Sequence, residues 1–179
     1  MYYIESERLK LIPLNYEHLL LYKNNRPALE KALGLNPSTM VIDAFYKAET
    51  KDALQNFWLP NTKLYPELYY WYTSWEIVLK QTNTSIGGIG FGGYPDDYGE
   101  TSIGYVVDQQ HWGFGYATEA LNTISKWGFA FTLLKALKAD TQSHNLLSQR
   151  VLIKAGFKHT DSKNGLLYYR LPKGNTLAS

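Results

Sequence analysis

The sequence contains no cysteine. That absence excludes disulfide bonds, thiolate zinc sites and a cysteine nucleophile, and it argues against a small secreted protein held together by disulfides. No apolar run reaches the length of a membrane span, and the opening stretch MYYIESERLKLIPL carries charges where a signal peptide needs an apolar core. We therefore expect a cytoplasmic protein that does not act at a membrane.

An excess of charge of one sign is also lacking. The formal net charge is +2, from 18 Lys and Arg against 16 Asp and Glu. A nucleic-acid-binding protein would carry a dense basic stripe, so no nucleic-acid partner is expected. The histidines show no metal-ligand spacing, and we expect no bound metal. They are His18, His111, His144 and His159.

Apolar residues, in contrast, are plentiful. Hydrophobic residues make up 45% and aromatic residues 15% of the 179 positions. Such a chain can bury a sizeable core, and its length fits one domain spanning residues 1–179. Core positions are expected for Trp71 and Trp75, which alternate along an aromatic stretch.

The spacing of apolar residues changes along the chain from a strand period to a helical period. The first part predicts a strand at 8–14, helices at 15–24 and 42–58, and strands at 69–80, 85–94 and 101–107. Short polar turns join the last three strands, so they should form an antiparallel meander. The remainder predicts a helix at 117–131, a strand at 137–140, a helix at 145–155 and a hairpin turning at Asn164 and Gly165.

The segment 101–140 thus runs strand, glycine loop, helix, strand. A connection of this kind joins parallel strands by a right-handed crossover. The predicted fold class is therefore α/β, with a mixed, mostly antiparallel twisted sheet that contains one parallel strand pair and is flanked by helices.

The stretch QQHWGFGYATEAL (109–121) places Gly113 and Gly115 just before a predicted helix. A helix N-terminus has unpaired N–H groups and a partial positive charge, and glycines let an anion approach the main chain. The alternative is a tight turn that happens to use glycine. The spacing lacks the residues that a Walker or a Rossmann phosphate loop requires.

The segment Gln110 to Gly115 matches Q/R-x-x-G-x-G/A, the pyrophosphate loop of the GNAT superfamily of N-acetyltransferases. The longer stretch IGYVVDQQHWGFGYATEAL resembles the subfamily that includes ribosomal-protein N-terminal acetyltransferases. Two further segments, NLLSQRVLIKAGF and SERLKLIPL, resemble its later helix and its opening strand. The resemblance is clear from about residue 85 to 170 and almost absent from 26 to 68.

This resemblance implies acetyl-coenzyme A as the donor and a primary amine as the acceptor, either a protein N-terminus or a small amine. It implies a parallel strand pair that splays apart to admit the pantetheine arm. Residues 26–68 would then form a helical insertion on the acceptor side that shapes the choice of amine. A monomer or a homodimer is expected.

The resemblance also implies a set of cofactor-binding residues. The main chain of Val106 and Val107 would hold the acetyl carbonyl and the pantetheine. The diphosphate would bind at the loop and the first helical turn, with Gln110 and Phe114 standing where basic residues are frequent. The loop and helix positions are Gln110, Trp112, Gly113, Phe114, Gly115, Tyr116, Ala117 and Thr118.

Several of these residues have two readings. Thr118 would either donate to a phosphate or help to cap the helix, whereas Glu119 suits the helix dipole and is expected to be structural. Asn145 is either a helix N-cap or a pantetheine contact. Ser148 would lie near the sulfur and donate a proton to the departing thiolate.

The base that removes the amine proton is the least determined role. Glu100 precedes the strand 101–107, and a family Glu is common at the position that is Ser102 here. Glu100 would replace it from the same strand face. It could equally be a turn carboxylate, with deprotonation through water.

The sequence therefore predicts an acetyltransferase in which the amine attacks the thioester directly within a ternary complex. Two other readings stay open. One is a non-catalytic acyl-coenzyme A sensor that keeps the fold, and the other is a nucleotide-binding domain that would prefer ATP or NAD.

Overall fold

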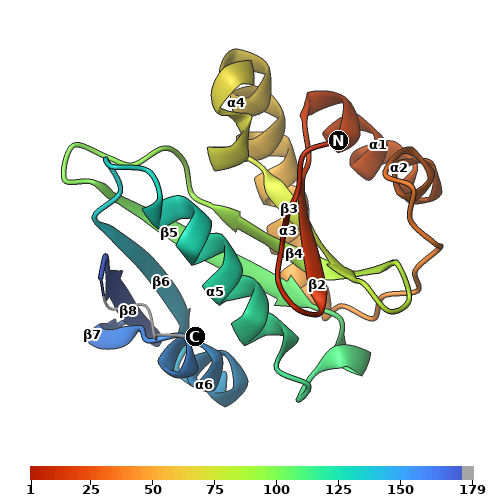
Figure 1. The fold of residues 1–179 in the computed structure, drawn as a ribbon. Coiled ribbons are helices and arrows are strands. Elements are labelled where there is room, and N and C mark those ends of the chain that lie inside the picture. The colour runs from red at the N-terminus through yellow and green to blue at the C-terminus, as the bar shows by residue number, and fades with distance from the viewer. Residues whose placement is uncertain (175–179) are drawn as a thin grey trace.

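The computed structural model describes residues 1–174, so the predicted domain boundary at residue 179 lies outside the described part. One sheet of eight strands forms the centre of the fold, in the order β1-β2-β3-β4-β5-β6-β8-β7 (Figure 1). The strands are β1 Ile4–Glu5, β2 Leu9–Pro13, β3 Ser74–Leu79, β4 Thr84–Phe91, β5 Glu100–Val107, β6 Ala136–Gln142, β7 Lys158–Lys163 and β8 Leu166–Pro172. The pair β5 and β6 is parallel and every other pair is antiparallel, which confirms the predicted fold class.

Six α-helices flank the described part of the sheet. They are α1 Tyr16–Asn24, α2 Arg26–Ala32, α3 Ala44–Ala53, α4 Leu59–Leu64, α5 Tyr116–Phe129 and α6 Leu146–Lys154. A π-helical turn, η1 Leu54–Trp58, joins α3 to α4 without a break, and short 3-10 helices occupy η2 Pro66–Trp71 and η3 Gln109–His111. No helix within residues 1–174 is both long and apolar enough to cross a membrane.

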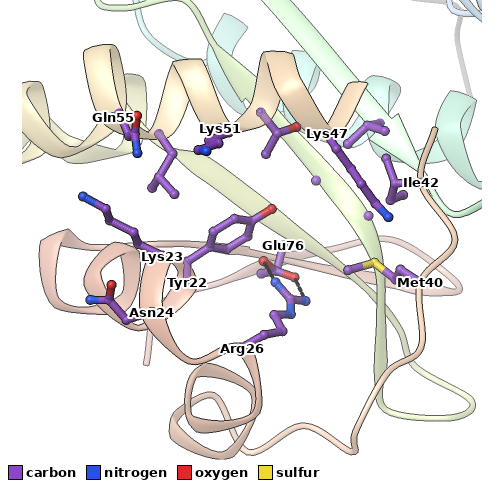
Figure 2. Close-up of a pocket in the computed structure, with 15 residues that line it drawn as sticks. Tyr22, Lys23, Asn24, Arg26, Met40, Ile42, Lys47, Lys51, Gln55 and Glu76 are labelled. Carbon is purple, nitrogen blue, oxygen red and sulfur yellow. Dashed lines mark hydrogen bonds and ion pairs between the residues drawn. The ribbon is translucent and has the colours of Figure 1, made fainter. Parts of the chain in front are cut away.

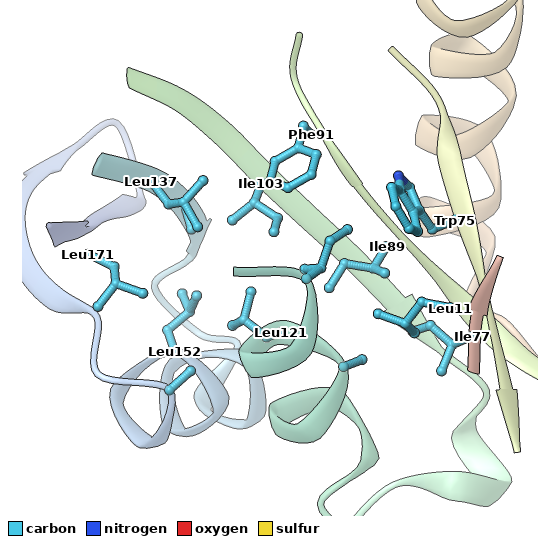
Figure 3. Close-up of a cluster of buried hydrophobic side chains, with 14 of the residues drawn as sticks. Leu11, Trp75, Ile77, Ile89, Phe91, Ile103, Leu121, Leu137, Leu152 and Leu171 are labelled. Carbon is cyan, nitrogen blue, oxygen red and sulfur yellow. The ribbon is translucent and has the colours of Figure 1, made fainter. Parts of the chain in front are cut away.

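Period-two alternation along the strands produces a core on each face of the sheet. On β3, Trp75 and Ile77 belong to the larger core, whereas Val78 belongs to the smaller one. The larger core packs the sheet against α5 and α6 (Figure 3), and Trp71 and Trp75 are both buried in it as predicted. The smaller core packs the opposite face against α1, α2 and η1, as Leu19, Leu29 and Leu54 show.

The parallel pair separates shortly after it forms. Pairing between β5 and β6 covers only Glu100, Thr101 and Ser102 against Ala136, Leu137 and Lys138. Beyond this point β5 continues beside β4, and β6 continues beside β8 to Gln142. The sheet therefore has a gap between residues 103–107 of β5 and 139–142 of β6, which has the splayed form that the resemblance implied.

Three sequence predictions need correction. The aromatic stretch 69–80 was expected to be one strand, but Pro66 starts a 3-10 helix that continues to Trp71, so β3 begins only at Ser74. The helix expected at 42–58 runs from Ala44 through η1 into α4 and ends at Leu64. Helix α2 was missed; Asn25 caps it and Pro27 lies in its first turn.

Candidate active site

The loop before α5 has an open main chain. Gly113 and Gly115 both have φ of +84°, a conformation that L side chains rarely adopt, and this explains the two glycines. A Cβ at Gly113 would meet no atom within 4 Å. No side chain caps α5, and within residues 1–174 the N–H groups from Gly113 to Thr118 have no hydrogen-bond partner. These donors and the helix dipole fit a diphosphate.

The loop residues differ in what they can offer. The N–H of Trp112 donates to the Gln109 carbonyl at 3.2 Å, and its indole N–H donates to the Val107 carbonyl at 2.7 Å. Both N–H groups of Trp112 therefore already have partners within the protein. The expectation that its amide faces the diphosphate needs correction. Gln110 is exposed, as is Phe114, whose ring stacks at 5.9 Å on Tyr116. Because no side chain caps α5, a capping role for Thr118 has no support.

Arg8 on the approach to β2 holds the loop in place. Its Nε and Nη2 atoms lie 2.7 Å and 2.6 Å from Oε2 of Glu119, and its Nη1 donates to the Phe114 carbonyl at 3.1 Å. The guanidinium also lies 4.5 Å from the ring centre of Tyr116. Burial would raise the pKa of Glu119, but hydrogen bonds from Ser6 and Arg8 outweigh it and hold the pKa below its ordinary value. Glu119 is thus structural, as predicted.

Replacing Arg8 with Ala should weaken acetyl-coenzyme A binding by about fivefold, the size expected for a half-exposed, charge-assisted contact. The loop would lose the donor that fixes the Phe114 carbonyl, while the main-chain donors remain. Titration calorimetry measures this change. Lys10→Ala serves as the control, because it removes the same charge two residues later, within β2. Equal losses of affinity in both variants would contradict a local role for Arg8.

The backbone of β5 decides which amides face the splay. The N–H of Asp108 donates to the Ile86 carbonyl, and the N–H of Gly92 donates to the Ser102 carbonyl, both at 2.8 Å. Antiparallel pairing alternates, so even-numbered β5 residues bond to β4 and odd-numbered ones turn their N–H groups the other way. Val106, opposite Gly88, is thus committed to β4. The amides of Tyr105 and Val107 face the splay, so the main-chain contact expected of Val106 fits Tyr105 instead.

A cluster of hydroxyl groups lies where β5 approaches α6. The Tyr105 hydroxyl is 3.0 Å from Oγ of Ser148, whose N–H donates to the Asn145 side chain at 3.0 Å. Asn145 is therefore the N-cap of α6, and its amide also donates to the Tyr46 hydroxyl of α3 at 2.6 Å. Burial raises the pKa of Tyr105 to about 12, although the hydrogen bond with Ser148 works in the opposite direction. Tyr105 is thus a neutral donor at physiological pH.

Glu100 lies far from this cluster. Six residues of strand separate it from Val106, which corresponds to about 20 Å. Its carboxylate is 2.8 Å from Nη2 of Arg170 and 3.4 Å from Nζ of Lys138. The hydrogen bond from Arg170 holds the pKa of Glu100 below its ordinary value, against the effect of desolvation and with help from Lys138. The expectation that Glu100 acts as the base is therefore corrected, because it is both distant and paired.

A carboxylate pair on the other side of the splay was missed. Asp140 alternates with the core residues Leu137 and Ala139 of β6, so it faces away from α5. Glu49 comes from α3, which covers that same face. Burial, followed by the charge of Asp140, raises the pKa of Glu49. No local pattern indicates this pair, because its members lie 91 positions apart in unrelated segments.

The segment 26–68 contacts the end of β5 directly. The N–H of Val41 donates to Oδ1 of Asp108 at 2.9 Å, and the Val41 carbonyl accepts from Gln109 at 3.0 Å. Helix α3 then passes along a cavity of about 480 Å³ whose lining includes Gly87, Gly88 and Val106 of the sheet (Figure 2). The part of the chain without resemblance to the subfamily therefore forms one wall of a cavity beside the splay.

Comparisons with known proteins agree with this geometry. The acetyltransferase (GNAT) domain family matches residues 8–158, and the chain therefore belongs to that family. It is 35% identical over 86 residues to the uncharacterized N-acetyltransferase YjdG of Bacillus subtilis, covering 48% of this chain and 51% of YjdG. The chain thus matches about half the length of this curated relative.

Solved structures share the fold at low sequence identity. The ribosomal-protein-S5-alanine acetyltransferase from Vibrio fischeri superposes with a TM-score of 0.65 at 18% identity, over 99% of this chain and 100% of that one. Mycobacterium smegmatis RimJ in complex with CoA-disulfide superposes with a TM-score of 0.62 at 18% identity, over 96% and 85%. The family predicted from the three motifs is confirmed, and the structures of similar fold include the subfamily that the sequence resembles.

Proposed function

We propose that the protein transfers the acetyl group of acetyl-coenzyme A to a primary amine by direct attack in a ternary complex. The observation that carries this proposal is the row of N–H groups from Gly113 to Thr118 that have no partner among residues 1–174. They lie at the N-terminus of α5, next to a splayed strand pair. The relatives named as N-acetyltransferases and the coenzyme A complex of similar fold support the choice of donor.

Each side of the splay would have its own task. The bound thioester supplies the acetyl group, with a C–N bond forming to the amine as the C–S bond breaks. The amide of Tyr105 would stabilise negative charge on the carbonyl oxygen, an effect worth about 3 kcal/mol at other such sites. The amide of Val107 lies about 7 Å further along the strand and would bind the pantetheine arm. Tyr105, hydrogen-bonded to Ser148, would give its proton to the departing thiolate, and Ser148 would hold the phenol in position.

Glu49 is the carboxylate we propose for accepting the amine proton, directly or through water. Its place on the acceptor face of the splay suits a base, as does its pKa, which burial and then the charge of Asp140 raise above the ordinary value. Glu49→Gln should lower kcat about tenfold or more, as loss of general base catalysis does. Glu100→Gln is the matched control, and its kcat should stay within about twofold. A larger loss in Glu100→Gln than in Glu49→Gln, measured across pH, would reverse the assignment.

The function itself is tested by measuring coenzyme A thiol release while amines and peptides are offered, with mass spectrometry of the acetylated product. Release that depends on an amine and yields an N-acetylated product is expected. Saturable acetyl-coenzyme A binding without turnover on a broad panel would indicate a sensor instead. Stronger thermal protection by ATP or NAD than by acetyl-coenzyme A would indicate a nucleotide-binding domain.

A further inference from the structure

The cavity beside the splay has a size and position suited to an acceptor. Its volume of about 480 Å³ lies within the range of small-molecule sites, roughly 300–1,000 Å³. The strand register runs Glu76 opposite Gly88 and Gly88 opposite Val106, so these three residues form one row across β3, β4 and β5. Neighbouring strands lie about 4.8 Å apart, which makes the row about 10 Å long. The end of the row at Val106 adjoins the amides of Tyr105 and Val107.

The middle of the cavity floor has no side chains. Gly87 and Gly88 lie there, between the Glu76 carboxylate and Val106. Side chains at these positions are hindered as well, because a Cβ at Gly87 would come within 2.2 Å of the Val106 carbonyl oxygen. An extended molecule could therefore lie along the floor with one end at the splay.

One guanidinium serves both buried carboxylates at the floor of the cavity. Nη1 and Nη2 of Arg26 each lie 2.7 Å from a different oxygen of Glu76, and its Nε lies 3.3 Å from Oε1 of Glu30. Ser85 also donates to Glu76. Burial, followed by the charge of Glu76, raises the pKa of Tyr22 to about 12, so its phenol adds no negative charge at neutral pH. Arg26 is therefore fully engaged with Glu76 and Glu30, and the floor has no cation left over for a ligand.

The rim, in contrast, has an excess of positive charge. Lys47 and Lys51 come from α3 on one side of the cavity and Lys23 comes from α1 on the other (Figure 2). None of these lysines forms an ion pair with any residue from 1 to 174. Among residues 1–174, Glu76 is the only carboxylate in the lining. The lysines of the rim therefore attract anions and repel positively charged molecules.

We infer that the acceptor is an anionic amine, a molecule that carries one or more carboxylates within a few bonds of the amino group. This inference rests on the proposed function, since it identifies the substrate class of that reaction. The amine would point along the glycine floor to the splay while its carboxylates meet Lys23, Lys47 and Lys51. Two sources share this chemistry, a free acidic amino acid and a peptide N-terminus followed by acidic residues. Polyamines and aminoglycosides, which are polycations, do not.

The experiment compares acceptors that differ only in charge. The peptide pair begins with serine followed by two glutamates or by two glutamines, each with an amidated C-terminus, so the reacting amine is the same. Free glutamate tests the small-molecule source, and spermidine tests a polycation. Wild-type kcat/KM should be about tenfold higher for the acidic peptide than for the neutral peptide, because the glutamates of the acidic peptide would pair with the unpaired lysines of the rim. That preference should shrink as salt is added.

Variants then locate the preference. Lys47→Gln combined with Lys51→Gln should reduce the ratio to about twofold or less, mainly through KM. Lys31→Gln removes an exposed charge of α2 that does not line the cavity and should leave the ratio unchanged. A ratio that persists in the double variant, or faster acetylation of spermidine than of the acidic substrates, would overturn the inference.

Failure of the inference can be told apart from failure of the proposed function. Calorimetric binding of the acidic peptide to the protein saturated with coenzyme A needs no turnover. Lysine-dependent binding without acetylation would support the charge preference and reject the transfer. Acetylation of neutral or cationic amines without binding of the acidic peptide would reject the charge preference and support the transfer. Absence of both would reject both.

Discussion

Replacing Gly113 with Asp should weaken acetyl-coenzyme A binding by about two orders of magnitude. The φ of Gly113 is +84°, and no atom of residues 1–174 would lie within 4 Å of a Cβ there, so a side chain would project into the space before α5. A carboxylate about 5 Å from a phosphate charge costs about 3 kcal/mol at an effective dielectric constant of 20, and 1.4 kcal/mol corresponds to tenfold in affinity. Calorimetric titration with acetyl-coenzyme A measures the loss.

Two matched variants separate charge from backbone strain. Gly113→Asn has nearly the same shape and the same tolerance of positive φ, but it carries no charge. Its affinity should fall only modestly. Gly165→Asp places the same residue at a φ of +78° in the β7–β8 turn, outside the loop before α5, and should bind acetyl-coenzyme A normally. Equal weakening in Gly113→Asn and Gly113→Asp would contradict an anion at this loop.

Local sequence signals were sufficient for most of the fold. Strand β2 and helix α1 lie within the predicted ranges 8–14 and 15–24, and Asn164 and Gly165 both adopt the positive φ of a tight hairpin turn. The aromatic run at 69–80 predicted a strand over its whole length because tyrosine and tryptophan favour strands. Pro66 and the packing of Trp71 against Phe91 and Trp127 decided for a 3-10 helix there.

The candidate site likewise contains some residues that local sequence signals predict and others that depend on long-range contacts. The positive φ values of Gly113 and Gly115 and the N-cap role of Asn145 follow from residues adjacent in the chain, so they were accessible to sequence reasoning. Arg8 was not, because its contact with Glu119 joins positions 111 residues apart. The main-chain role expected of Val106 moved to Tyr105 because strand parity depends on the register with β4. Long-range pairing of this kind leaves no local trace in the sequence.

Replacing Tyr105 with Phe should lower kcat about a hundredfold, the lower end of the range for general acid catalysis, because a thiolate leaves without much help. Binding of acetyl-coenzyme A should change little, since the phenol contributes to proton transfer and the main-chain amides stay in place. Ser148→Ala removes the partner at 3.0 Å and should lower kcat less, about tenfold. Steady-state kinetics with a saturating amine measure both.

The pair should also respond as a unit. If Ser148 acts by positioning the phenol, the double variant should be no slower than Tyr105→Phe alone, because the effects of groups acting together are not additive. The wild-type rate should not fall between pH 7 and 10 through loss of this acid, since the pKa of Tyr105 lies at about 12 and the protonated form persists throughout that range. A different result would contradict this. If wild-type kcat fell with a midpoint below pH 9 and the fall were absent in Tyr105→Phe, the phenol would be losing its proton in that range. If the kcat loss of the double variant instead equalled the product of the two single losses, Ser148 would be a second, independent donor.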